Sequence, residues 1–252
     1  MFPIRDHNPA ERPAIVTYIL IAVNVLIYVY GLAALTDDRA LSQFYFDYAL
    51  IPARLNEGEA YSALITSMFL HGGFMHLAGN MLFLWIFGDN MEDKMGSVGF
   101  LIFYLLSGVA ATYVHYLTVP TSPVPLVGAS GAIAGVMGGY LLLFPKAQVD
   151  IFVFFVVIIR IFPLPAWIML ALWFGLQVFN GVGTSAEGGG VAYWAHASGF
   201  VIGLLLTIPV WLRSGAAEFW RRTDGHPDHP EATYDFIKSR MPKVRRGSGS
   251  GR

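Results

Sequence analysis

The chemistry of this chain starts from one serine and one histidine. Ser130 stands in the stretch GASGA at 128–132, and His196 stands in AHASG at 195–199. Each stretch opens an apolar run typical of a membrane helix. A hydroxyl is a weak nucleophile that needs a base within hydrogen-bond reach, and histidine is the usual base near neutral pH. The pair therefore predicts nucleophilic catalysis inside a bilayer.

Two further polar residues fit the same chemistry. His76 and Asn80 are spaced i, i+4, so a helix would place both on one face. Both side chains can donate hydrogen bonds to a developing oxyanion. Helix N-termini add free N–H groups and partial positive charge.

The composition indicates a membrane protein. The 252 residues are 55% apolar and only 13% charged, against roughly 25% charged in a soluble domain. The net charge of −1 gives no basic field for nucleic acid, and the lack of cysteine excludes disulfides and thiolate sites. We expect an all-α polytopic membrane protein.

Six apolar segments are expected to cross the bilayer as helices: 13–35, 74–88, 98–119, 128–144, 164–182 and 193–212. Residues 149–162 are apolar but short, and Pro163 and Pro165 break them. We interpret them as a re-entrant or interfacial excursion. With six crossings, Ser130 and His196 begin their helices in the same leaflet; a seventh crossing would separate them.

The distribution of basic residues favours six crossings. With the N-terminus inside, the outer segments hold only Arg39 and Arg54. The predicted organisation is a cytoplasmic segment at 1–12, a six-helix domain at 13–212 and a polar cytoplasmic tail at 213–252. The carboxylates Asp89, Glu92 and Asp93 are expected at the inner end of the second span, solvated or paired with Lys94.

Each of these signals alone has a simpler explanation. A serine among glycines is more often a packing device, and a histidine or asparagine in a span more often bonds a neighbouring helix. His115 and Gln177 are interpreted in that way. The glycines at 131, 135 and 139 and the stripe of His196, Gly199 and Gly203 predict close helix packing. The convergence of the polar residues in one leaflet favours catalysis.

Other classes fit less well. His71 and His76 lack an acidic partner at metal-binding spacing, so a metal site is not expected. A transporter or channel would predict charged residues within the spans and an internal repeat, and neither is present. The sequence sets no oligomeric state.

Together these motifs resemble the rhomboid intramembrane serine proteases. The resemblance rests on GASG at 128–131, AHASGF at 195–200 and HGGFMHLAGN at 71–80. It implies a six-transmembrane-helix rhomboid fold, with Ser130 as nucleophile and His196 as general base. It also implies an oxyanion hole formed by His76, Asn80 and the Ser130 N–H. It implies no metal or other cofactor, and the expected partners are the lipid bilayer and transmembrane substrates cleaved near the outer membrane face.

The same resemblance implies an outer cavity capped by residues 118–127, and a bacterial inner membrane as the location. Two positions depart from it. A Trp-Arg pair of many relatives is absent near Ser62 and Ala63, and Ala134 replaces a tyrosine that packs on the histidine in some. The second departure leaves the orientation of His196 to other neighbours. The alternative is a non-catalytic rhomboid-like protein that binds membrane clients.

Overall fold

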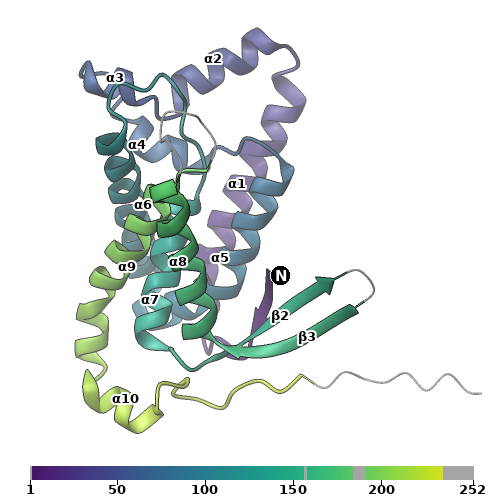
Figure 1. The fold of residues 1–252 in the computed structure, drawn as a ribbon, viewed down its shortest axis with the longest axis vertical. Coiled ribbons are helices and arrows are strands. Elements are labelled where there is room, and N and C mark those ends of the chain that lie inside the picture. Colours follow the sequence, from purple (N-terminus) through teal and green to yellow (C-terminus); the bar gives the residue numbers. More distant parts are fainter. Residues whose placement is uncertain (1, 156–157, 184–190, 235–252) are drawn as a thin grey trace, which may run out of the picture.

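The computed structural model describes residues 2–155, 158–183 and 191–234. It contains a helix at each predicted span, and these helices form one bundle (Figure 1). They are α1 (Ile15–Ala34), α5 (Phe74–Met95), α6 (Ser97–Thr118), α7 (Ser130–Leu143), α8 (Ala166–Gly183) and α9 (Tyr193–Arg213). The chain is therefore a mainly helical polytopic membrane protein.

The helices differ in how they can cross a membrane. Within the described residues, α1, α6, α8 and α9 are each long and apolar enough to span. The short helices α4 (Ala63–Thr66) and η1 (Ser67–Phe69) form a fifth candidate with α5, bent by 95° at the break. At 14 residues, α7 is about 21 Å long. Length and composition thus support four to five spans, and the predicted number of six stays a prediction.

Helix α7 forms the centre of the bundle and packs against α5, α6, α8 and α9. Every residue from Gly131 to Tyr140 is buried. A Cβ at Gly199 or Gly203 of α9 would overlap the carbonyl groups of Gly131 or Gly135 of α7. The predicted small-residue contact is therefore present, and it brings the two backbones together.

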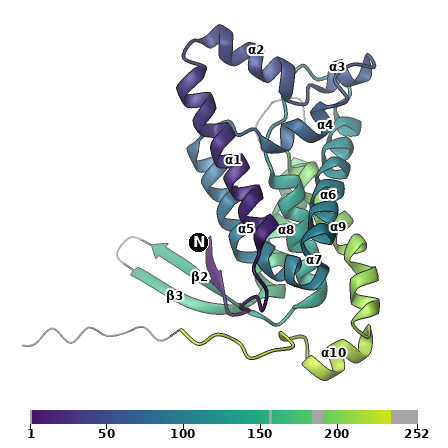
Figure 2. The same cartoon turned by 180° about the vertical axis from the view of Figure 1, so that it is seen from behind.

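Short helices cover one end of the bundle, at the N-terminal ends of α5, α7 and α9. They are α2 (Asp38–Tyr48), α3 (Pro52–Asn56), α4 and η1. Asp37 caps α2 by accepting a hydrogen bond from the Ala40 amide at 2.8 Å. The other end carries a sheet and α10 (Ala217–Thr223), as both views show (Figures 1 and 2).

Residues 149–162, interpreted from the sequence as a re-entrant or interfacial excursion, contain strands, and their position relative to the membrane stays a prediction. They form most of an antiparallel hairpin, β2 (Gln148–Phe155) and β3 (Ile158–Pro165), and β1 (Phe2–Asp6) pairs with the other edge of β2. The segment is rich in valine, isoleucine and phenylalanine, which favour strands. Pro163 and Pro165, which follow the segment, lie in the edge strand β3, where a missing N–H is tolerated.

A buried polar cluster joins the sheet to the bundle. The Tyr140 hydroxyl near the end of α7 donates to the Asp6 carboxylate at 2.7 Å. Asn8 donates to the same hydroxyl, and Asn90 of α5 donates to the Asn8 carbonyl. The residues next to β1 thus hold the ends of α5 and α7 together.

Glu92 differs from the expectation of a solvated or Lys94-paired carboxylate. It is buried, with 2% of its surface exposed. It accepts hydrogen bonds from the amides of Val16 and Thr17 at 2.9 and 2.8 Å, and from the hydroxyls of Thr17 and Ser97. The carboxylate therefore caps the first turn of α1 from a neighbouring helix, where the helix dipole favours negative charge.

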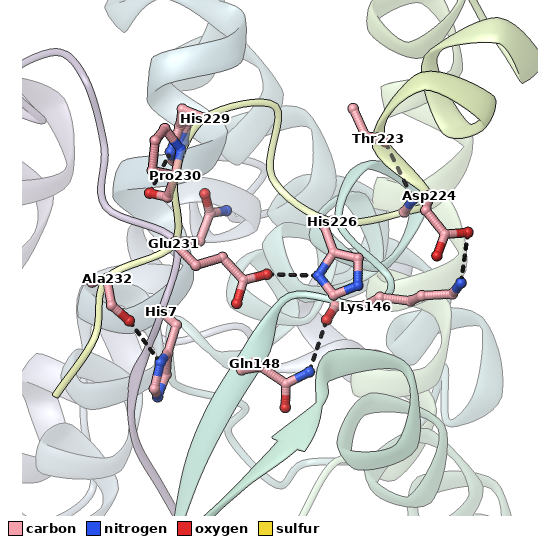
Figure 3. Close-up of polar contacts among 12 residues, drawn as sticks. His7, Lys146, Gln148, Thr223, Asp224, His226, His229, Pro230, Glu231 and Ala232 are labelled. Atoms are coloured by element: carbon pink, nitrogen blue, oxygen red, sulfur yellow. Dashed lines mark hydrogen bonds and ion pairs between the residues drawn. The ribbon is translucent and has the colours of Figure 1, made fainter. Parts of the chain in front are cut away.

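The first part of the polar tail packs under the bundle. Phe219 of α10 is buried, and the Trp220 indole donates to the Leu142 carbonyl at the end of α7. Beyond α10 the chain passes close to the start of β2, where Lys146 pairs with Asp224 at 2.9 Å (Figure 3). Residues 235–252, with most of the basic residues of the predicted tail, lie outside the described part.

The segment that follows α10, residues 224–234, forms a strap that also reaches the N-terminal segment. The His7 ring bonds to the Ala232 carbonyl through Nδ1 at 2.8 Å (Figure 3), and its Nε2 lies 3.0 Å from the Asp150 carboxylate. Lys94 pairs with Asp228 of the strap at 2.7 Å. Although burial raises the pKa of Asp228, the hydrogen bond and charge of Lys94 lower it, and the net shift is downward.

Candidate active site

Ser130 and His196 meet across the α7–α9 interface. Ser130 is the first residue of α7, and His196 lies in the first turn of α9. The His196 Nε2 atom lies 2.7 Å from the Ser130 Oγ atom, which is hydrogen-bond distance for a nucleophile and its base. The glycine contacts along the interface make this approach possible, because no Cβ separates the backbones.

Gln177 of α8 holds the other side of the histidine ring. Its Oε1 atom lies 2.9 Å from His196 Nδ1, and its Nε2 donates to the Trp173 carbonyl at 3.2 Å. Because an amide oxygen only accepts, Nδ1 must carry the proton, and Nε2 is then an acceptor for the Ser130 hydroxyl. The Gln177 contact thus selects the histidine tautomer that can act as a base.

Sequence reasoning missed this role of Gln177, which it treated as a contact between helices. The available signal was a buried amide in an apolar span, one helical turn after Trp173. The Trp173 ring stacks on His196 with centroids 5.9 Å apart. Trp173 thus packs on the histidine ring in this chain, in which Ala134 replaces the tyrosine that packs on the histidine in some relatives.

His76 and Asn80 face Ser130 from α5. Asn80 is 7% exposed, and within the described residues its Nδ2 donor has no hydrogen-bond partner. The His76 ring lies against Gly128, where an added Cβ would come within 2.7 Å of Nε2. Gly128 has a φ of 127°, which favours glycine. Glycine at this position thus permits both the turn into α7 and the place of the His76 ring.

All four predicted site residues line one cavity of about 570 Å³. The walls of this cavity are mostly apolar, and its polar side chains lie around the first turn of α7. The backbone amides of that turn have no acceptor within the helix. The predicted cap contributes Pro125, Leu126 and Val127. Leu126 is held in place by a pair of backbone hydrogen bonds with Leu50. The other lining residues are Met75, Gly79, Phe83, Ile133, Met137, Trp173, Val191 and Ala192.

Other titratable residues lie outside the cavity lining. His71 contacts the His76 ring edge to face, with centroids 5.1 Å apart, and His115 lies in the last turn of α6, at the same end of the bundle as Ser130. No group of three or more histidine, aspartate or glutamate residues able to hold a metal ion occurs in the described ranges. The arrangement is a hydroxyl, an imidazole and hydrogen-bond donors, which is the equipment for acyl transfer.

Comparison with known proteins gives a consistent result. Residues 58–213, more than half of the chain, match the model of the Rhomboid domain family. The chain is 31% identical over 221 residues to Rhomboid protein 1, mitochondrial, of Saccharomyces cerevisiae, covering 84% of this chain and 57% of that protein.

Two other relatives come from plants and bacteria. Rhomboid-like protein 11, chloroplastic, of Arabidopsis thaliana is 32% identical over 159 residues, covering 62% of this chain and 53% of that protein. Rhomboid protease GluP of Bacillus subtilis is 42% identical over 78 residues, covering 31% and 15%. The chain thus spans about half the length, or less, of these relatives.

Proposed function

Because the chain belongs to the rhomboid family, we propose that it is an intramembrane serine endopeptidase that cleaves transmembrane substrates. The observation that carries the proposal is the 2.7 Å contact between His196 Nε2 and Ser130 Oγ inside a cavity that His76 and Asn80 also line. This arrangement supplies a nucleophile, its base and two donors to one reacting carbonyl.

In the proposed reaction, Ser130 Oγ attacks the carbonyl carbon while His196 Nε2 takes the hydroxyl proton. The Ser130 amide, the His76 ring and the Asn80 amide donate to the resulting oxyanion. His196 then gives its proton to the leaving amine, the C–N bond breaks and the acyl-enzyme forms. A water molecule, deprotonated by His196, hydrolyses the ester and returns Ser130 to its starting state.

The proposed cut lies near the outer membrane face. Ser130 and His196 lie at the N-terminal ends of α7 and α9, and Lys94, Lys146 and Arg213 lie at the opposite end of the bundle. The bias of basic residues toward the inner side supports a cytoplasmic location for that end and for both terminal segments. The protein is integral and multi-pass. We propose the inner membrane of a bacterium as its location, although its relatives include organellar proteins.

The test uses two readouts in proteoliposomes: covalent labelling by a fluorophosphonate and cleavage of a fluorogenic transmembrane peptide with small residues at its outer end. Ser130→Ala and His196→Ala are expected to abolish both. Ser198→Ala is the matched control, since its hydroxyl donates to the Ala195 carbonyl and does not line the cavity. Turnover by Ser130→Ala equal to that of the original protein would refute the proposal. A folded original protein that never labels would favour the non-catalytic client-binding protein.

A further inference from the structure

A second cavity lies at the end of the bundle opposite the candidate active site. It has a volume of about 340 Å³ and lies between α6, α9 and the end of α5. The α6 wall contains Gly99, Ile102, Phe103 and Leu106, and the α9 wall contains Leu206, Val210 and Arg213; Lys94, Met95 and Ser214 complete the lining. Neither the proposed reaction nor the family comparison gives this groove a role.

The walls of the groove suit an acyl chain. Residues 99, 102, 103 and 106 lie on one face of α6, and residues 206, 210 and 213 lie on one face of α9. From Gly99 to Leu106 the groove extends about 10 Å along the helix axis. Ile102 and Leu106 are about half exposed, so a chain in the surrounding bilayer can reach both.

Positive charge is confined to one end of the groove. Lys94 and Arg213 lie there, and none of the described lining residues is acidic. Lys94 is already paired with Asp228. Arg213 is exposed, and no carboxylate among the described residues forms an ion pair with it. A guanidinium can bind a phosphate through two parallel hydrogen bonds, and basic pockets between membrane helices on the cytoplasmic side bind lipid headgroups.

We propose that this groove binds an anionic phospholipid. One acyl chain lies between α6 and α9, and the phosphate pairs with the Arg213 guanidinium. The headgroup class follows from charge: a choline headgroup would place a fixed positive charge beside Lys94 and Arg213, whereas a glycerol headgroup adds none. The site is independent of Ser130 and His196, which lie at the other end of the bundle.

The test measures lipid binding on the full chain carrying Ser130→Ala, so its result does not depend on proteolysis. Phosphatidylglycerol and phosphatidylcholine with identical acyl chains are titrated in detergent and counted by native mass spectrometry. Both lipids bring the phosphate, and only phosphatidylcholine adds a positive charge beside Lys94 and Arg213. We therefore expect phosphatidylglycerol to bind about tenfold more tightly, which is about 1.4 kcal/mol and the scale of one like-charge contact near the protein surface. Arg213→Gln should remove the preference. The control Arg12→Gln removes one charge from the exposed segment before α1 and should leave it intact.

A second variant tests the groove without changing charge. A Cβ at Gly99 would touch only the Met95 side chain, at 3.4 Å, so Gly99→Leu fills the α6 wall and should weaken binding of both lipids. Equal binding of the two lipids by the starting protein would identify an ordinary annular lipid and overturn the proposal. So would a preference that survives Arg213→Gln, a loss of preference in Arg12→Gln, or unchanged binding by Gly99→Leu.

Discussion

The contact between Gln177 and His196 makes a quantitative prediction. Gln177→Leu keeps a side chain of similar length and removes the oxygen that accepts from Nδ1, 2.9 Å away. A buried donor left without an acceptor costs about 1–3 kcal/mol. If the proton moves to Nε2 instead, the ring can no longer accept the Ser130 proton. Either outcome raises the barrier, so we expect kcat to fall by about 5- to 150-fold.

The assay separates positioning from binding. Gln177 does not line the substrate cavity, so KM should stay unchanged while kcat and the rate of fluorophosphonate labelling fall together. Gln177→Glu restores an acceptor at the same place and should recover most of the lost rate. Asn180→Leu is the matched control, since it makes the same kind of change three residues along α8.

Two results would refute this reasoning. One is a Gln177→Leu protein that labels and turns over at the original rate, because the tautomer would then be set by other groups. The other is a Gln177→Glu protein as slow as Gln177→Leu, because the loss would then reflect packing. Thermal unfolding of each variant shows whether the fold is retained.

Three further predictions concern stability, each measured by thermal unfolding in detergent. Gly203→Leu should destabilise the protein by about 1–3 kcal/mol through overpacking against the α7 backbone. Gly175→Leu should not, because the space around Gly175 is open. Equal effects of the two variants would argue against the close contact between α7 and α9. Glu92→Ala should lower the free energy of unfolding by about 1 kcal/mol or more, because it leaves the buried donors of α1 unpaired. Glu57→Ala, at an exposed position, should not change it. An unchanged stability of Glu92→Ala would contradict the capping role of Glu92. Burial raises the pKa of Asp6 well above its usual value, so its folded form binds the proton more tightly and stability is lost as pH rises above about 4. Asp6→Asn should therefore unfold at a higher temperature than the original protein at pH 8 and at a similar one at pH 4, and a pH-independent difference would contradict the assignment.

The candidate site was predictable because its residues are exceptions within apolar segments. Placing a histidine, serine or asparagine side chain in hydrocarbon costs free energy, so such residues are rare in membrane spans. The few that occur in this chain include all four candidate site residues. The number and direction of the spans then place Ser130, His196, His76 and Asn80 at one end. The structure brings all four to one cavity. Gln177 was on the same list, but only its distance to His196 distinguishes a positioning contact from a packing contact.

The sheet and the capping carboxylate depend on contacts distant in sequence. Strand β2 pairs with residues 2–6 as well as with β3, and a short apolar run does not reveal whether it forms a strand or a buried helix. Glu92 lies 75 residues from the Thr17 amide that it binds. Local patterns predict that a carboxylate near the end of α5 is solvated. Only the packing of α1 on α5 brings unpaired amides within its reach.

The short length of α7 explains why both of its ends need such contacts. A helix of about 21 Å cannot reach both surfaces of a hydrocarbon core of about 30 Å. In the proposed topology at least one end of α7 therefore lies below a membrane surface, where backbone groups must be paired within the protein or face a water-filled cavity. At the end near β2, Trp220 donates to the Leu142 carbonyl and Tyr140 donates to Asp6. At the other end, the free first-turn amides and Ser130 open into the cavity. In the proposed topology the short length of α7 thus accounts for both features: the polar contacts at its end near β2, and a nucleophile that opens into a cavity below the outer membrane surface.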